Sequence, residues 1–218
     1  MPSQMSSAIG TKVIIAFTGL ALFGFLIAHL AGNLLILAGP EAFNAYSHKL
    51  ISNPLIYVAE AGLALLFVLH IWKTVGNYVR NRGARPTAYE MKKPAGHTSR
   101  KTLSSTWMIF SGTTILVFLV LHLKTLKFGA HYATAEPGVR DIYRLTVEVF
   151  QRPGYVIWYV VAMVLVGMHL RHGITSALQS IGAIPEAMKR KVLVAGAVVA
   201  ALIAGGFALL PVYIYLFL

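Results

Sequence analysis

Residues 17–30 read FTGLALFGFLIAHL, and residues 110–123 read FSGTTILVFLVLHL. Both stretches follow the pattern F-[ST]-G-x9-H-L, which places histidines at His29 and His122. Each stretch lies in a longer apolar run, and about 20 mainly apolar residues are enough to cross a bilayer as a helix. The two stretches therefore predict two related transmembrane helices, each with a histidine in its second half.

The composition supports a membrane protein. Of the 218 residues, 57% are hydrophobic and 12% are charged, whereas soluble domains have roughly 45–50% and 25%. The mean hydropathy of +0.69 excludes a soluble globular domain and a disordered chain. The chain has no cysteine, which excludes disulfides and any zinc, iron–sulfur or thioether-linked haem site built on its own thiols.

We expect an all-α fold: a single domain over residues 1–218, formed as an integral membrane bundle of five transmembrane helices. These helices are expected at about 13–37, 55–76, 104–126, 154–176 and 192–217. The net charge is +12, and 13 of the 19 Lys and Arg residues fall on the side of the N-terminus. Positive charge gathers in cytoplasmic loops and near anionic lipids, so the N-terminus is expected in the cytoplasm and nucleic acid is not an expected partner.

Two outer segments complete the expected architecture. Residues 38–54 are interpreted as a polar loop. Segment 137–151, PGVRDIYRLTVEVFQ, predicts a short amphipathic helix at the outer interface that begins at Pro137, because proline is favoured in the first turn of a helix. Ile142, Leu145 and Val149 would form its apolar side.

The repeat extends to a second helix in each half. Leu69-His70-Ile71 corresponds loosely to Met168-His169-Leu170, so the first four helices form two copies of one helical pair. At 1.5 Å per residue, His29 and His122 lie at one depth near the outer surface. His70 and His169 lie at a second depth, nearer the cytoplasm.

Ionisable residues inside a membrane are costly and usually functional. One such histidine could be a hydrogen-bonded packing residue, but two depth-matched pairs on four helices indicate bis-histidine ligation of two haems b. The two irons would be separated by roughly 15–20 Å along the membrane normal. Such a spacing favours transmembrane electron transfer.

Further residues match a known family. They form two stretches: Asp141-x-Tyr143, Phe150, Pro153, Tyr155 and His169-Leu-Arg-His172-Gly173-x-x-Ser176-Ala177-x-Gln179-x-x-Gly182; and His29-Leu-Ala-Gly32-Asn33 with Tyr46-Ser47-His48-Lys49-Leu50. Over nearly its whole length the chain resembles the five-helix, di-haem cytochrome b membrane anchor of succinate:quinone oxidoreductases, the succinate dehydrogenase and fumarate reductase family.

The resemblance implies a function in complex II of the respiratory chain and the tricarboxylic acid cycle. The chain would be the non-flavin membrane subunit in a prokaryotic plasma membrane. Electrons would pass between cytoplasmic flavoprotein and iron–sulfur subunits, which hold the FAD and the clusters, and membrane menaquinone or ubiquinone. The dicarboxylate chemistry would occur on a partner, so no catalytic residue is expected here. His29 and His122 would bind the distal haem, and His70 and His169 the proximal haem.

Other polar residues are candidates for contacts to these groups. Arg171 and His172 follow His169 and could bind haem propionates; alternatively they are cations at a helix end, favoured by the helix dipole. The quinone candidates at the outer end are Asn33, Tyr46, His48 and Glu60. For Glu60 the alternative is a side chain that reaches the interface. Some fumarate-reducing members of the family that this chain resembles are thought to move protons through the middle of the fourth helix. Helix 154–176 contains no acid, so the resemblance implies succinate oxidation rather than fumarate reduction.

Two rival functions remain open at this point. One is the di-haem cytochrome b subunit of another quinone-linked dehydrogenase, such as a hydrogenase or formate dehydrogenase. The other is a transporter that uses its histidines as proton relays; many secondary transporters have inverted repeats or broken helices, and neither is evident in the sequence.

Overall fold

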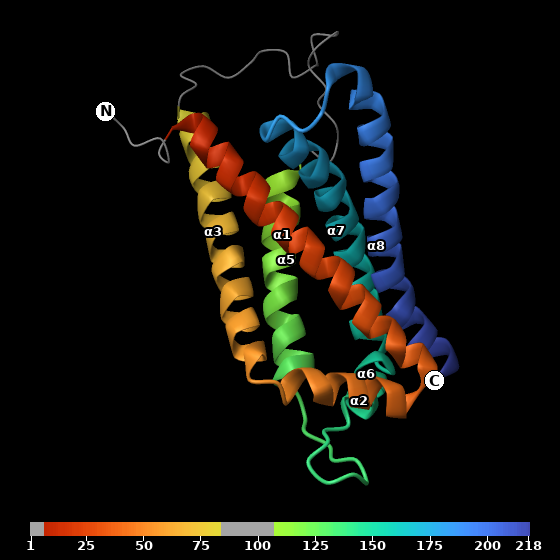
Figure 1. The fold of residues 1–218 in the computed structure, drawn as a ribbon. Helices are drawn as coiled ribbons and strands as arrows, with labels where there is room; N and C mark the ends of the chain where they lie inside the picture. The colour runs from red at the N-terminus through yellow and green to blue at the C-terminus, as the bar shows by residue number, and fades with distance from the viewer. Residues whose placement is uncertain (1–6, 84–106) are drawn as a thin grey trace.

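The computed structural model describes residues 7–83 and 107–218 and forms an all-α bundle (Figure 1). Five of its helices are long and apolar enough to cross a membrane, as the sequence predicts. They are α1 (Ala8–Leu34, continued by a 3-10 turn Leu35–Ala38), α3 (Leu55–Gly83), α5 (Met108–His122, continued by a π-helical turn Leu123–Lys127), α7 (Pro153–Ser180) and α8 (Lys189–Phe217).

Several helices are longer than their apolar runs. Helix α3 continues to Gly83 through Arg80 and Arg82, because charged residues end a hydrophobic run without ending a helix. Helix α1 begins at Ala8, where the side chain of Ser7 accepts a hydrogen bond of 3.0 Å from the Gly10 amide. This contact satisfies one of the free amides of the first turn.

Residues 38–54, expected as a loop, contain helix α2 (Pro40–Ile51). The chain turns at Gly39, whose φ of +98° is disfavoured for other residues. Pro40 then occupies the first turn with Glu41, and Lys49 lies in the last turn. Proline and an acid at the start, with a cation at the end, are recognisable helix signals.

Helix α6 (Ile142–Phe150) starts five residues later than predicted. Pro137 lies in a turn with Gly138, whose φ is +81°, and an antiparallel bridge pairs Ala133 with Arg140. The helix is capped by Asp141, whose carboxylate accepts a hydrogen bond of 3.0 Å from the Arg144 amide. The helix packs against protein: Leu145 and Val149, two of the three expected apolar residues, are buried in the core.

Helix α7 is the centre of the bundle and packs against α1, α5 and α8. On its α8 side Gly167 is essential for close approach, since a Cβ there would lie 3.0 Å from the methyl group of Ala204. Small residues allow this kind of close helix packing in membranes. At the end of the bundle that carries α2 and α6, Phe43, Phe150 and Ile214 belong to one buried hydrophobic cluster.

Helix α3 is the most exposed of the five long helices. It packs mainly against α1, and none of its residues is buried. Leu65, Val68 and Trp72 are all largely exposed. Figure 1 shows α3 at the edge of the bundle, with α8 at the opposite edge.

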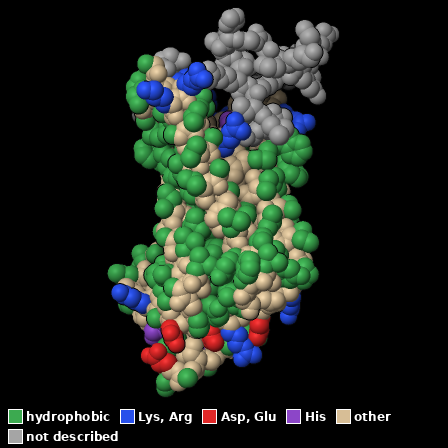
Figure 2. Space-filling view, turned by 90° about the vertical axis from the view of Figure 1, so that its right-hand side faces the viewer, with side chains coloured by type: hydrophobic (Ala, Val, Ile, Leu, Met, Phe, Trp, Pro, Cys, Tyr) green, Lys and Arg blue, Asp and Glu red, His purple; other side chains and the backbone are tan. Residues whose placement is uncertain are grey.

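On one face of the molecule the charged side chains gather at the two ends. Figure 2 shows a hydrophobic band between an end with Lys and Arg side chains and an end with both basic and acidic side chains. We name these the N-terminal end, where α1 begins, and the α2–α6 end. The apolar band between charged ends, together with the five long helices, makes this a multi-pass membrane protein.

Candidate functional site

His70 of α3 is held by a hydroxyl of α1. The Oγ1 atom of Thr18 lies 3.0 Å from Nδ1 of His70 and donates its own proton to the carbonyl of Ile14 at 2.8 Å. Because that proton is already engaged, the hydroxyl acts as an acceptor and the imidazole Nδ1–H donates to it. The neutral ring then keeps a free lone pair on Nε2, the atom required to bind a metal.

The second half of the chain repeats this arrangement. Ser111 of α5 lies with its Oγ atom 3.1 Å from Nδ1 of His169 on α7, and the same hydroxyl donates to the Met108 carbonyl at 3.1 Å. Ser111 is only 1% exposed, so water does not compete for these bonds. His169 therefore also carries its proton on Nδ1 and leaves Nε2 free.

The glycine of each F-[ST]-G motif makes room for the same histidine. A Cβ at Gly19 would lie 3.2 Å from Cε1 of His70, and one at Gly112 would lie 3.5 Å from Cε1 of His169. The short motif thus supplies a hydroxyl acceptor and a gap in the helix surface. It serves the histidine of the following helix rather than the one in its own helix.

His29 and His122 face each other at the other level. Their ring centroids are 5.8 Å apart, and the ring planes are almost perpendicular at 87°. An imidazole nitrogen binds a metal at about 2.0–2.1 Å, so two rings on opposite sides of one iron have centroids roughly 6 Å apart. The observed separation fits a bis-histidine haem.

The neighbours of these two histidines differ from those of His70 and His169. Nδ1 of His122 lies 3.1 Å from the hydroxyl oxygen of Tyr159 on α7. The ring of His29 stacks on Phe25 at 5.2 Å between centroids and contacts Phe207 of α8 at 5.6 Å. Asn33 donates from its side-chain amide to the carbonyl oxygen of His29 at 2.7 Å.

His70 and His169 are close enough to interact electrostatically. The residues proposed to contact propionates follow along α7. Arg171 is exposed, whereas His172 is partly buried and interacts electrostatically with His169. Neither side chain has a hydrogen bond to another described residue, although the backbone carbonyl of Arg171 accepts one from the Thr175 hydroxyl at 3.0 Å.

The four predicted quinone residues have different surroundings. Tyr46 lies over Gly32 of α1, because a Cβ at Gly32 would be 2.7 Å from the hydroxyl oxygen of Tyr46; this places it next to Asn33. Nδ1 of His48 is buried without a hydrogen-bond partner among the described residues. Glu60 is ion-paired with Lys127 of the π-helical turn, which ties α3 to the end of α5.

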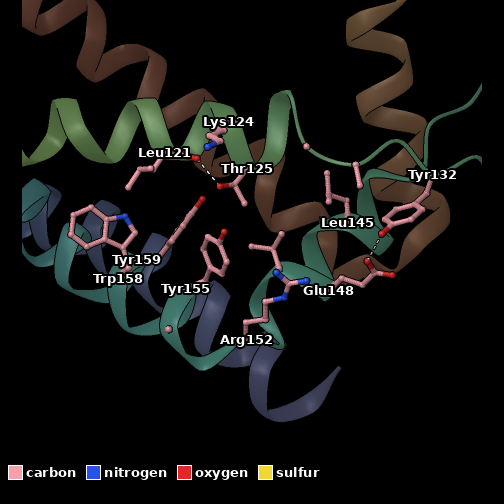
Figure 3. A pocket seen from close by; sticks show the side chains of 14 residues that line it. Leu121, Lys124, Thr125, Tyr132, Leu145, Glu148, Arg152, Tyr155, Trp158 and Tyr159 are labelled. Atoms are coloured by element: carbon pink, nitrogen blue, oxygen red, sulfur yellow. Dashed lines mark hydrogen bonds between the residues drawn. The ribbon is translucent and has the colours of Figure 1, made fainter.

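A feature that the sequence analysis missed is a cavity of about 690 Å³ at the α2–α6 end. It lies between the π-helical turn, α6 and the start of α7 (Figure 3). None of the predicted quinone residues lines it. Its polar and aromatic lining includes Lys124, Glu148, Arg152, Tyr155, Trp158 and Tyr159.

A sequence signal for this cavity was present. Tyr155, Trp158 and Tyr159 have spacings of three and four residues, which puts them on one face of a helix. Figure 3 shows their three rings following one another along α7. An aromatic face at the end of a span is typical of membrane interfaces, so the pattern alone did not distinguish a pocket from an anchor.

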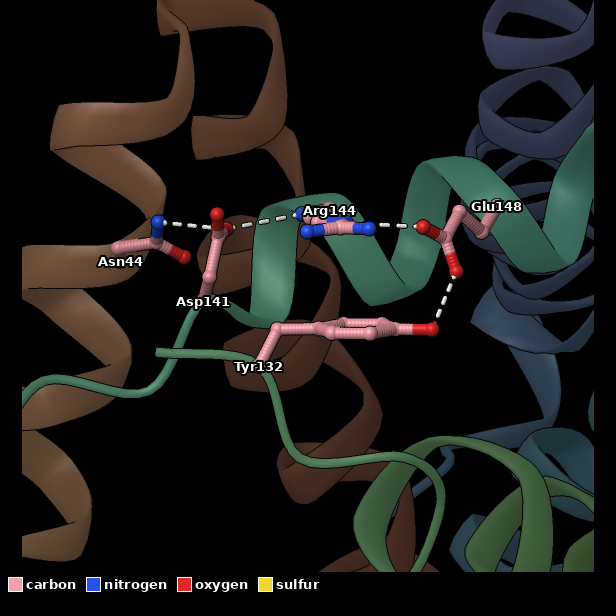
Figure 4. Close-up of polar contacts among 5 residues, drawn as sticks. All are labelled: Asn44, Tyr132, Asp141, Arg144 and Glu148. Carbon is pink, nitrogen blue, oxygen red and sulfur yellow. Dashed lines mark hydrogen bonds and ion pairs between the residues drawn. The ribbon is translucent and has the colours of Figure 1, made fainter. Parts of the chain in front are cut away.

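The rim of the cavity is fixed by a polar network (Figure 4). Glu148 accepts hydrogen bonds from the Tyr132 hydroxyl at 2.6 Å and from Nε of Arg144 at 2.9 Å. The guanidinium of Arg144 also lies over the Tyr132 ring, 4.2 Å from its centroid. The hydrogen bond from Tyr132, followed by that from Arg144, holds the pKa of Glu148 below its ordinary range, and the same bond to Glu148 raises the pKa of Tyr132.

The network continues from α6 to α2. Asn44, a buried residue of α2, donates to Asp141 at 2.9 Å and accepts from the amide of Tyr143 at 2.9 Å. Both groups of the Asn44 side chain are therefore satisfied at the start of α6. This pairing fixes α6, and with it one wall of the cavity, against α2.

No protein-family model, no curated protein sequence and no solved structure matches this chain.

Proposed function

We propose that this chain is the membrane-anchor cytochrome b subunit of a succinate:quinone oxidoreductase. It would bind two haems b, which supply one-electron redox chemistry, and would connect soluble flavin and iron–sulfur subunits to membrane quinone. The observation that carries the proposal is the arrangement of the four histidines. They come from four helices: His29 faces His122, His70 interacts electrostatically with His169, and the two that are hydroxyl-bonded keep Nε2 free.

The ligand assignments follow the pairs. His29 and His122 would hold one haem, and His70 and His169 the other. Thr18 and Ser111 orient the second pair by accepting from Nδ1–H, an interaction that fixes ring direction and increases ligand basicity in metal sites. Arg171 and His172 would meet propionates near the N-terminal end, where a guanidinium binds carboxylate with two hydrogen bonds.

The absence of buried residues in α3 supports a bound group inside the bundle. A helix of 29 residues that has no buried residue gains little packing energy from the protein alone. Nevertheless α3 directs His70 toward α1 and α7. A macrocycle held by His70 would supply the contacts that the inward side of α3 lacks.

The charge distribution supports an orientation for the chain in the membrane. The N-terminal end carries the excess of Lys and Arg, and such an end faces the cytoplasm. The soluble subunits, with FAD and iron–sulfur clusters, would dock there, nearest His70 and His169. Electrons would leave through His29 and His122 toward quinone at the α2–α6 end, in a prokaryotic plasma membrane.

The test is a reduced-minus-oxidised spectrum with haem quantitation, made on the full chain purified with its bound partners. Wild type should contain two haems b, and His29→Ala and His70→Ala one each. His131→Ala, which removes an exposed histidine outside the bundle, is the matched control and should retain both.

A folded wild-type complex without haem would contradict the proposal. Co-purified flavoprotein with succinate-dependent quinone reduction identifies the partner. Hydrogenase or formate dehydrogenase activity instead would assign the chain to one of those enzymes.

A further inference from the structure

We propose that the cavity between the π-helical turn, α6 and α7 binds the ring of a quinone, with Tyr159 connecting that ring to His122. This inference rests on the proposed function, and it places the quinone away from the residues expected from the sequence. The volume of about 690 Å³ lies in the range of small-molecule sites, about 300–1,000 Å³.

The hydrogen bond of Tyr159 gives the first reason. Its hydroxyl oxygen lies 3.1 Å from Nδ1 of His122. If His122 binds iron through Nε2, the neutral ring has its only proton on Nδ1 and donates it to Tyr159. The hydroxyl proton of Tyr159 then has no acceptor among the described residues, so it remains available to a molecule in the cavity that Tyr159 lines.

Trp158 supplies a second donor. Its indole Nε1 is buried and has no hydrogen-bond partner in the described part of the chain, although Trp158 lines the same cavity. A buried donor without an acceptor is costly, about 1–3 kcal/mol in proteins generally. A quinone offers two carbonyl oxygens, which only accept, and a flat ring that stacks on aromatic side chains such as Tyr155.

Charged residues at the mouth of the cavity connect it to water, the source of protons. Lys124, Glu148 and Arg152 line it near the charged end of the molecule, where water is accessible. Reduction of one quinone takes two electrons and two protons and gives one quinol. The electrons would come from a dicarboxylate oxidised on the flavin of a partner subunit, and the protons from water at this mouth. Tyr159 is a positioning residue here, because its hydrogen bond orients the quinone and it gives up no proton.

The test measures binding of a fluorescent hydroxyquinoline N-oxide, a quinol analogue, to the purified complex by fluorescence quenching. Tyr159→Phe removes the hydroxyl alone and should weaken binding about 3- to 10-fold, the usual effect of one hydrogen bond. Trp158→Phe should weaken it by a similar factor. The matched control is Tyr57→Phe on the exposed face of α3, which should bind like wild type.

A second variant fills the cavity. Gly154 lines it, and a Cβ at this position would meet no atom within 4 Å. Gly154→Leu should therefore fold but lose binding by more than tenfold. Gly76→Leu, at an equally open position on α3 outside the cavity, should bind normally.

Three results would overturn the inference. The first is wild-type affinity for the analogue in both Tyr159→Phe and Gly154→Leu. The second is loss of analogue binding in Tyr46→Phe. Displacement of the analogue by phospholipid vesicles, but not by quinone, would assign the cavity to lipid. Haem content separates these failures from failure of the proposed function. Variants that keep two haems and bind the analogue like wild type would overturn the cavity assignment alone. A wild-type complex without haem would overturn the proposed function.

Discussion

The hydroxyl of Thr18 lies 3.0 Å from Nδ1 of His70, and the hydroxyl of Ser111 lies 3.1 Å from Nδ1 of His169. Each contact joins the first helix of a repeated pair to the histidine of the second. The hydroxyl in F-[ST]-G therefore has a defined role, which is to fix the proton and the orientation of an imidazole on the neighbouring helix.

Thr18→Val should reduce retention of the haem bound by His70. Valine has nearly the same shape but leaves Nδ1–H without an acceptor, and losing such a partner typically costs 10–100-fold in metal affinity. The measurement is transfer of haem from the purified complex to apomyoglobin. Thr18→Ser keeps the acceptor and should behave like wild type; equal haem retention in all three proteins would show that the hydroxyl does not support the ligand.

The two motif glycines should respond differently to alanine. At Gly19 the new methyl group would lie 3.2 Å from His70, closer than ordinary contact, whereas at Gly112 the distance to His169 is 3.5 Å. We expect Gly19→Ala to lower the free energy of unfolding by about 1–3 kcal/mol through overpacking. Gly112→Ala should be close to neutral, because alanine also favours the helix by up to about 1 kcal/mol.

Thermal unfolding in detergent, followed by circular dichroism, checks this order. Similar losses in both variants, or a larger loss at Gly112, would contradict the steric argument.

Arg140 holds the end of the π-helical turn. Its guanidinium donates to the carbonyl oxygens of Leu126, Lys127, Gly129 and Ala130 at 2.9–3.3 Å. Lysine has one nitrogen and cannot reach all four, so Arg140→Lys should destabilise the fold by about 1–3 kcal/mol. Because the π-helical turn lines the cavity, Arg140→Lys should also weaken binding of the quinol analogue.

The control is Arg82→Lys, at an exposed position whose one hydrogen bond among the described residues goes to Tyr78 in its own helix; it should leave both properties unchanged. A fully stable Arg140→Lys protein would show that these bonds are replaced by water.

Glu148 should make stability sensitive to acid. Its folded-state pKa is held below the ordinary value of 4.5 by hydrogen bonds from Tyr132 and Arg144. A group with a depressed pKa stabilises the fold above that ordinary value and stops doing so as the pH falls through the folded pKa. The unfolding temperature of wild type should therefore fall as the pH is lowered from 5 to 3, and Glu148→Gln should reduce this fall.

Tyr132→Phe removes the main cause of the shift and should move the loss to higher pH. An unfolding temperature that depends on pH identically in wild type and Glu148→Gln would contradict this role for the carboxylate.

The sequence alone predicted the five spans, because long apolar runs leave few alternatives. The repeat predicted that His29 and His122 lie at one depth, and the structure has their rings in contact; the pairing of all four as haem ligands stays a prediction. Helix α2 was missed, since its polar residues concealed the signals from Pro40 to Lys49. The helix α6 was predicted to begin at Pro137, but Asp141 caps it and it begins at Ile142. Proline is common in turns as well as in the first turn of a helix, so Pro137 alone did not decide the start.

The cavity could not be predicted, since its walls come from three separate elements and its depth depends on how the chain from Phe128 to Asp141 folds back. The roles of the histidines as haem ligands and of the chain as a succinate:quinone oxidoreductase subunit stay predictions.

The repeat has a further consequence for symmetry. Equivalent positions of the two copies lie near each other: the rings of His29 and His122 are in contact, and His70 interacts electrostatically with His169. Two such copies running in the same direction would be related by an approximate two-fold rotation, and the described helices depart from it because α1 packs against α7 whereas the equivalent pair α3 and α5 does not pack closely. In each copy the histidine follows the hydroxyl residue by 11 positions, about 16 Å along the helix. A single helix thus holds one side of both sites, and a residue inserted between Thr18 and His29 would rotate one site out of alignment with the other by about 100°.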